Sequence, residues 1–423
     1  EPLALYCFLA ACHVGLGLGY FIGVSTEPRP HARVYSGVHS SSLRITRISI
    51  FLAAIKAIPS YLRQTGIASF SVQGVLQGLL AGIINPGQQY ASKLAYYAET
   101  QTSIPWILFS AITAPLAWLM VPLSMVHWDS LTGAQKIMCI GALVLDIIGW
   151  ISVGTNKGIL DSALLIVIGL AIRQLTRPHR RAPRRSVRVL AVLLMTIPLV
   201  YLVITVQSRL GGVSTYGWSS GVGVDWDRPL MAITPRPLKN ALIVISSYMT
   251  QGYYGLSLAM CEPFSSTFGI GNSLFLTSLF ERLFGATDIV GLTYPGKIEY
   301  MGWDRLVNWH SFYTWVASDV SFYGVPFIMI LVGWMLAVSW IGASCCGDPY
   351  STGMFTLMVM LVVYIPANNQ VFAFYHTWCA FWGLFCVWAL KRFSLRIRHA
   401  RCCGRPYYAD SDAAAGRVKE GYR

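Results

Sequence analysis

Runs of about twenty mostly apolar residues recur along this chain, and they limit its fold more than any other feature, because a helix of that length crosses a bilayer. In the hydrocarbon core only helices and closed barrels satisfy every backbone hydrogen bond. The composition agrees, since 55% of the residues are hydrophobic and 12% are charged, against about 25% charged in soluble domains. We therefore expect an all-α, polytopic integral membrane protein.

Nine runs are long enough to span. They are residues 3–24, 47–65, 104–126, 136–153, 159–176, 188–206, 321–341, 353–371 and 374–391. The chain begins at Glu1 rather than Met, and its first run lacks the basic segment and cleavage site of a signal peptide. We interpret the start as cut or processed, and the run as a spanning helix.

Lysine and arginine gather in two segments that contain no acid. Residues Arg173 to Arg188 include seven arginines, and "KRFSLRIRHARCCGR" follows the last run. Short loops of this kind stay in the cytoplasm, so the net charge of +14 mostly reports sidedness. Nucleic-acid binding is not expected, because no aromatic residue interleaves the arginines.

With both basic segments inside, residues 207–320 become a large outer loop. The chain is then a single transmembrane domain, residues 1–391, with a basic cytoplasmic tail, residues 392–423, that we expect to be disordered. Residues 66–85 and 240–285 either span or enter and leave on the same side. We favour a re-entrant or interfacial hairpin for the second segment, because polar and glycine residues break it. The expected total is about nine to eleven transmembrane helices.

Three segments of the chain carry a resemblance to a known family. "SYMTQGYYGLSLAM", "FGIGNSLFL" and "WHSFYTWVASDVSFYGVPFIMILVGWMLA", with a long outer loop and a basic loop ahead of it, resemble the Wzy-type O-antigen and capsular polysaccharide polymerases. The likeness covers about Gly154 to Trp388. It is a pattern of glycine, aromatic and polar positions rather than a fixed signature.

This resemblance implies a multi-pass GT-C-type glycosyltransferase in the bacterial inner membrane, with its active site facing the periplasm or exterior. The enzyme would move a growing glycan from undecaprenyl diphosphate onto another lipid-linked repeat unit. Its partners would be the undecaprenyl-diphosphate-linked oligosaccharide and membrane lipids, with a chain-length regulator protein and a flippase. No cofactor is implied. One departure is that many relatives have Gly-Gly-Arg where this chain has Gly154-Thr-Asn-Lys157-Gly.

The diphosphate leaving group requires cations, because negative charge grows on it as the glycosidic bond breaks. Arg209 follows an outward helix and Arg282 ends the loop hairpin, so we predict that both bind diphosphate oxygens. Snorkelling to lipid phosphates is the alternative for both, and more so for Arg282. Lys157 is a point charge rather than a bidentate fork. Asp225 and Asp227 are the alternative, a divalent metal site, although a capped turn is favoured for them. The predicted reaction is metal-independent.

His310 is the predicted general base, because its ordinary pKa of about 6.5 suits proton transfer near neutrality. An interfacial histidine bonded to backbone is the alternative. Asp319 lies nine residues later, on the opposite face of a continuous helix, and we favour it as the N-cap of a helix that re-enters at Ser321. The predicted substrate-binding residues are Lys157, Tyr253, Tyr254, Asn272, Trp309, Tyr313 and Asp319.

Two other functions remain open. An O-antigen ligase uses the same donor but transfers to lipid A core. A lipid-linked oligosaccharide flippase or transporter needs polar groups deep in its helices, and the apolar runs contain few charges apart from Lys56, Asp146 and Asp161. Asp146 is central in its run and is functional by default, but the sequence assigns it no role.

Overall fold

The computed structural model describes residues 2–27, 35–99, 103–176, 185–210, 225–285 and 288–403. Every regular element in these ranges is helical, which confirms the all-α prediction. Seven helices in this part of the chain are long and apolar enough to cross a membrane. They lie within α1 (Pro2–Thr26), α2 (Tyr35–Thr65), α5 (Ile104–His127), α6 (Gly133–Ser152), α7 (Lys157–Thr176), α8 (Arg185–Leu210) and α14 (Phe312–Cys346).

The last two predicted runs correspond to helices with different bounds. The apolar helix α15 (Pro349–Tyr364) has 16 residues, about 24 Å of rise, and residues 365–371 of the predicted run lie outside it. The helix α16 (Tyr375–Cys403) continues through residues 392–403, which were assigned to the tail. Residues 404–423 lie outside the described part of the chain.

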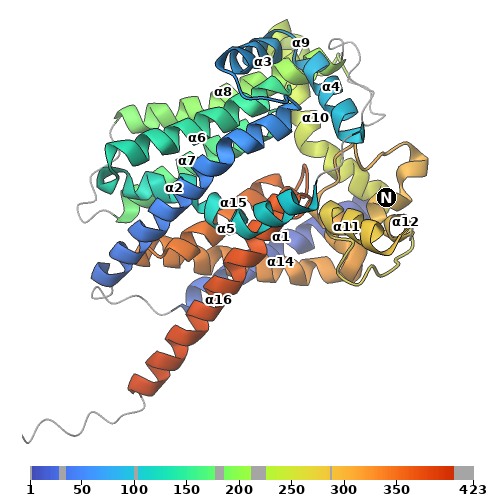
Figure 1. Cartoon of the computed structure of the whole chain (residues 1–423). Helices are drawn as coiled ribbons and strands as arrows, with labels where there is room; N and C mark the ends of the chain where they lie inside the picture. The colour runs from blue at the N-terminus through green and yellow to red at the C-terminus, as the bar shows by residue number, and fades with distance from the viewer. Residues whose placement is uncertain are drawn as a thin grey trace, which may run out of the picture.

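Helix α1 packs lengthwise against α14 through a stripe of glycines (Figure 1). A Cβ atom on Gly15 would lie 2.5 Å from the carbonyl oxygen of Pro326, and one on Gly19 would lie 1.9 Å from that of Ile330. Small residues at these positions let the two backbones approach, as is common between membrane helices. Because the contacted residue number in α14 rises with the residue number in α1, the two helices run in the same direction.

Helices α2 and α6 are also parallel, so the chain must return to one end of the bundle between them. Ile50 packs with Cys139 in one buried cluster, and further along a Cβ on Gly149 would meet Gln64 and Tyr61. We call the end at which α2 and α6 finish and α7 begins the cavity face. The opposite end is the basic-loop face.

Two short helices cover the cavity face between α2 and α5. Helix α3 (Val72–Ile84) has 13 residues, about 20 Å of rise, and is too short to cross. Helix α4 (Pro86–Glu99) follows it and packs on the end of α8. The ambiguous segment 66–85 therefore does not span, and α5 starts at the end where α2 finished.

The predicted outer loop folds as helices rather than as irregular chain. It contains α9 (Pro229–Ile233), α10 (Arg236–Ala259), α11 (Leu274–Phe284), α12 (Ile289–Leu292) and α13 (Tyr294–Lys297). Helix α11 has 11 residues, about 17 Å, so it does not cross. In Figure 1, α4 and α10 lie at the upper right of the molecule, and α11 and α12 lie below them on the same side.

Ion pairs join helices to neighbouring segments at the basic-loop face. Arg173 at the end of α7 bonds to Asp129 at 2.6 Å. On α16, Lys391 pairs with Asp348, and Arg392 pairs with Glu27. The described residues of both basic segments thus lie at the same end of the bundle, as the predicted sidedness requires.

Candidate functional site

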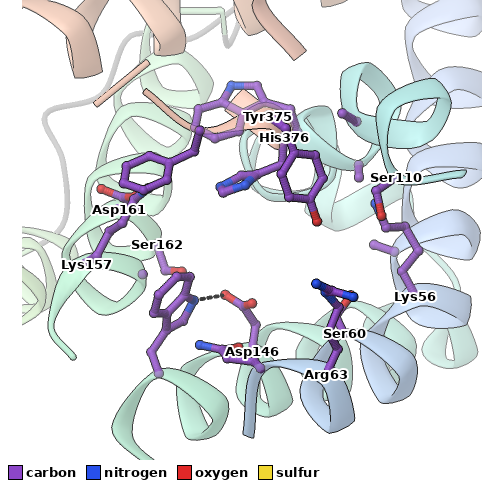
Figure 2. A pocket seen from close by; sticks show the side chains of 18 of the residues that line it. Lys56, Ser60, Arg63, Ser110, Asp146, Lys157, Asp161, Ser162, Tyr375 and His376 are labelled. Carbon is purple, nitrogen blue, oxygen red and sulfur yellow. Dashed lines mark hydrogen bonds between the residues drawn. The ribbon is translucent and has the colours of Figure 1, made fainter. Parts of the chain in front are cut away.

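A cavity of about 830 Å³ opens among α2, α5, α6, α7, α11 and the start of α16. Four cationic side chains and two carboxylates line it, which is a formal excess of two positive charges. They are Lys56, Arg63, Lys93, Lys157, Asp146 and Asp161. Figure 2 shows Lys157 and Asp161 on one side, Lys56 and Arg63 on the other, and His376 with Tyr375 across from Asp146.

Helix periodicity explains why α2 and α7 each present a pair of charged side chains to the cavity. Lys56 and Arg63 are seven residues apart on α2, which is two turns, so they share one face. The Lys56 ammonium lies 5.8 Å from the centroid of the Phe109 ring. Lys157 and Asp161 are four residues apart, at the start of α7, and share a face in the same way.

Lys157 is held by an aromatic ring rather than by a hydrogen bond. Its Nζ atom lies 3.2 Å from the centroid of the Phe374 ring, and among the described residues this buried Nζ has no hydrogen-bond partner. Asp161, in contrast, accepts hydrogen bonds from Tyr364 at 2.9 Å and Gln370 at 3.3 Å. The carboxylate is therefore fixed, and the ammonium keeps its donors available.

The α6 wall presents Asp146 to the cavity. Its carboxylate is exposed there and accepts one hydrogen bond from the Trp150 indole, at 3.2 Å. The indole sits directly over Gly158 of α7, where an added Cβ would lie 1.9 Å from the indole nitrogen. The glycine therefore makes room for the ring that orients Asp146.

Aromatic rings form much of the remaining surface. They belong to Trp106, Trp118, Trp150, Phe275, Phe374 and Tyr375. Such rings stack on the apolar faces of sugars, and they also accept cations. The imidazole of His376 lies within electrostatic range of both Lys56 and Lys157, so the two cationic walls converge on it.

Arg209 does not line the cavity, but it contacts the loop that forms part of the cavity wall. Its guanidinium donates to the Gly154 carbonyl oxygen at 2.5 Å and lies 3.7 Å from the centroid of the Tyr90 ring. Gly154 has φ of +60°, and a Cβ there would meet the Pro86 carbonyl oxygen at 2.0 Å, so only glycine fits. Arg209 thereby clamps the loop that ends at Lys157.

Lys93 lines the cavity and lies close enough to Arg209 to feel its charge. Its Nζ lies 5.7 Å from the Trp150 ring centroid and 5.9 Å from that of Tyr90. Burial, and then the positive charge of Arg209, lower the pKa of Lys93 to about 8. This lysine is therefore charged at neutral pH and loses its charge as the solution becomes alkaline.

His310, the predicted base, is placed elsewhere. Its side chain is 1% exposed, and among the described residues neither ring nitrogen has a hydrogen-bond partner. Burial, and then the charge of Arg305, lower its pKa to about 3. His310 does not line the cavity, and a group with so low a pKa is a weak proton acceptor. The alternative interpretation, a backbone-bonded histidine, also fails.

The predicted sugar platforms pack against other rings of the protein. Tyr253 stacks on the buried Tyr313 with centroids 6.4 Å apart. Trp309 meets Tyr248 at 4.1 Å, and Tyr254 meets Trp303 at 5.1 Å. The lining of the cavity contains none of Tyr253, Tyr254, Trp309 and Tyr313. Their rings pack α10 against the start of α14 and against the segment that precedes it.

Asp319 and Asn272 come together, but as part of the scaffold. The Asp319 carboxylate accepts hydrogen bonds from the backbone N–H groups of Gly269, Gly271 and Asn272 at 2.8, 3.1 and 2.9 Å. It also accepts from the side chains of Thr267 and Asn272. The predicted break at Ser321 is present, because Ser321 has non-helical φ and ψ within α14, whose own N-cap is Ser311. Among the described residues, however, the Asp319 carboxylate bonds to the loop before α11 and not to N–H groups after Ser321, so the predicted N-cap bond is not found.

Arg282, Asp225 and Asp227 are not part of the cavity lining. Arg282 is exposed in the last turn of α11. Asp225 accepts a hydrogen bond from the Asp227 backbone N–H at 3.2 Å and pairs with Arg228 at 2.9 Å, which is a capped turn. Among the described residues, no three His, Cys, Asp or Glu side chains are grouped for a metal ion.

Six Lys, Arg, Asp or His residues of the cavity had no assigned role in the sequence, namely Lys56, Arg63, Lys93, Asp146, Asp161 and His376. The available signal was the charge itself, because an ionisable residue inside an apolar run is expensive unless it serves a purpose. Of the predicted site residues, Lys157 lines the cavity and Arg209 supports its wall. Comparison of the chain with protein-family models, curated proteins and solved structures gives no match.

Proposed function

We propose that this protein is a polysaccharide polymerase of the membrane, which extends undecaprenyl-diphosphate-linked oligosaccharide repeat units at the cavity. The observation that carries the proposal is the excess of two positive charges in an aromatic-lined cavity among membrane helices. Each phosphate of a sugar diphospholipid is ionised at neutral pH. A diphosphate held there balances this excess, and the rings provide surfaces for the attached sugars.

Two of the cavity lysines have different charged neighbours. Lys157 lies near Asp161 on α7, while Lys93 on α4 lies near Arg209. Preorganised cations of this kind stabilise negative charge that grows on a leaving diphosphate. The reaction is therefore assigned to these side chains, with Arg209 holding the loop before Lys157 rather than touching the lipid.

The resemblance and the two basic segments support an orientation in the bacterial inner membrane. With the basic-loop face in the cytoplasm, the cavity opens toward the periplasm or exterior, where lipid-linked repeat units are available and nucleotide sugars are absent. This sidedness fits a donor that is a lipid diphosphate.

Purified protein in liposomes with lipid-linked repeat units provides the test. We expect a ladder of longer lipid-linked glycans, which Lys157→Gln and Lys56→Gln each reduce strongly. Lys136→Gln is the matched control, because Lys136 lies on α6 beside Trp128 and outside the cavity. Wild-type protein that forms no ladder would exclude the polymerase, and transfer only onto added lipid A core would identify a ligase.

A flippase for the same lipid is the second candidate. It is favoured by one observation, that Lys56, Asp146 and Asp161 lie within membrane helices and face a single cavity. Transporters bind their substrates at such sites. In the same liposomes a flippase moves unchanged repeat units to the other leaflet, and this movement is measured by their accessibility to an added glycosidase.

A further inference from the structure

Asp146 lines the cavity without an ion pair described for it. Asp146 lies six residues before the end of α6 at Ser152, about 9 Å along the helix, and its carboxylate accepts one hydrogen bond, from Trp150. An ionisable side chain within a membrane helix that faces a cavity is by default a functional residue. The proposed polymerase also requires a proton acceptor, a role that the placement of His310 leaves unfilled.

We propose that Asp146 is the general base that accepts the proton of the attacking sugar hydroxyl, and that Trp150 positions it. This inference rests on the proposed function. It assigns the acceptor sugar to the space between α6 and the start of α16, where Asp146 faces Tyr375 and His376 (Figure 2).

The other carboxylate of the cavity, Asp161, already accepts hydrogen bonds from the protein. Asp161 receives hydrogen bonds on both oxygens, from Tyr364 and Gln370, and it lies one helical turn from the Lys157 ammonium. Fixed in this way, it neutralises part of the cationic wall. Asp146 accepts its single bond on Oδ2, which leaves Oδ1 available to a substrate hydroxyl.

The histidine of the cavity is less suited to the task. His376 lies between the ammonium groups of Lys56 and Lys157, so a proton on its ring would place a third positive charge beside two others. A neutral imidazole in that position serves as a hydrogen-bond partner for a sugar hydroxyl.

Trp150 fixes the direction in which Asp146 points. The indole is held over Gly158, with no room for a side chain there, and the Lys93 ammonium lies 5.7 Å from its ring centroid. Its N–H donates to the carboxylate at 3.2 Å. Three helices, α4, α6 and α7, therefore set the position of one oxygen atom, as efficient proton transfer requires.

The proposed step conserves atoms and charge. The acceptor hydroxyl oxygen forms a bond to the anomeric carbon of the donor while the bond from that carbon to the diphosphate oxygen breaks. The bonding pair leaves with the diphosphate, whose additional negative charge is stabilised by the cavity lysines. The hydroxyl proton passes to Asp146 and is later released to water.

The experiment separates binding from proton transfer in the intact protein. Wild type and Asp146→Asn are reconstituted in liposomes, and both fluorescent polyprenyl diphosphate binding and chain growth are measured. Because a general base contributes about 10²–10⁴ in rate, we expect Asp146→Asn to lower chain growth at least about 100-fold with unchanged binding. Asp146→Glu should recover part of the rate. Asp129→Asn, in the ion pair at the opposite face, is the control.

Two further readouts distinguish a base from a structural carboxylate. The wild-type rate should rise with pH as the base ionises, and this rise should be absent in the residual activity of Asp146→Asn. Trp150→Phe keeps the ring but removes the N–H, and it should lower kcat while leaving KM unchanged.

Each contrary result has a separate meaning. Chain growth by Asp146→Asn at a near-normal rate, or parallel loss of binding and growth, overturns the role of Asp146 while the polymerase stands. Wild-type protein that neither binds the polyprenyl diphosphate nor extends chains overturns the proposed function, and the role of Asp146 with it.

Discussion

The ammonium group of Lys157 rests on the face of the Phe374 ring, 3.2 Å from its centroid, and among the described residues it donates no hydrogen bond. A cation on a ring is stabilised by about 0.5–2 kcal/mol, which is less than a charge-assisted hydrogen bond to phosphate provides. The ring thus keeps the lysine in place without competing strongly with an incoming anion.

Replacement of Phe374 tests this resting contact. We expect Phe374→Leu to bind polyprenyl diphosphate up to about 5-fold more tightly, because the unliganded state loses about 1 kcal/mol of cation–π stabilisation. Equilibrium binding to protein in nanodiscs measures the change. Phe109→Leu is the control, since its ring lies farther from a cavity lysine, at 5.8 Å from Lys56. Equal effects at both positions would contradict the role given to Phe374.

Lys93 predicts how binding depends on pH. Its pKa of about 8 means that it is protonated below this value and neutral above it. Affinity for the lipid diphosphate should therefore fall as the pH rises from 7 to 9, and Lys93→Gln should bind more weakly at pH 7 and lose most of the decline. A titration of binding against pH for both proteins checks this. An unchanged slope in the variant would exclude Lys93 as its source.

Substitution of Gly158 should cause a local packing defect. A Cβ there would lie 1.9 Å from the Trp150 indole nitrogen, so Gly158→Ala should displace the ring and destabilise the protein by about 1–3 kcal/mol. Chain growth should fall as well, because Asp146 loses its donor. Gly141→Ala, at a position with nothing within 4 Å, should keep both stability and activity. Thermal unfolding in detergent compares the two variants, and equal melting temperatures would refute the packing argument.

Sidedness can be tested with the native cysteines. Cys261 is exposed on the cavity face after α10, and Cys346 lies at the end of α14 toward the basic-loop face. In single-cysteine proteins in intact cells, a membrane-impermeant maleimide should label Cys261, while Cys346 should react only after the membrane is permeabilised. The reverse pattern would invert the orientation and place the cavity toward the cytoplasm.

Hydropathy predicted the bundle well because the length of an apolar run is a local property. Seven predicted runs coincide with helices that can span. The eighth run, 353–371, extends beyond α15 because hydropathy averages over Asn368, Asn369 and Gln370, which follow the end of the helix and lie in the turns that carry Gln370 toward Asp161. Whether an apolar residue continues a helix or ends it there depends on tertiary contacts that hydropathy does not contain.

The site was harder to predict, because it is assembled from helices distant in sequence. Lys157 was identified because it stands where the resembled polymerases have Gly-Gly-Arg, and it lines the cavity. His310 was chosen because imidazole suits proton transfer near neutrality, but its ring packs against Trp315 and does not line the cavity. Asp146 carried a visible signal, a charge in an apolar run, yet its partner Trp150 and the glycine beneath it become evident only once α6 and α7 are side by side.

The carboxylate of Asp319 ties the loop from Thr267 to Asn272 to the first half of α14. Ser273 and α11 follow this loop directly, and Leu274, Phe275 and Ser278 of α11 form part of the cavity wall. Two residues after Asp319, the helical geometry of α14 is interrupted at Ser321, where φ is +61° and ψ is 168°. Hydrogen bonds of Asp319 thus join the segment before this interruption to the α11 wall, so a substitution at Asp319 would reach the cavity although Asp319 does not line it.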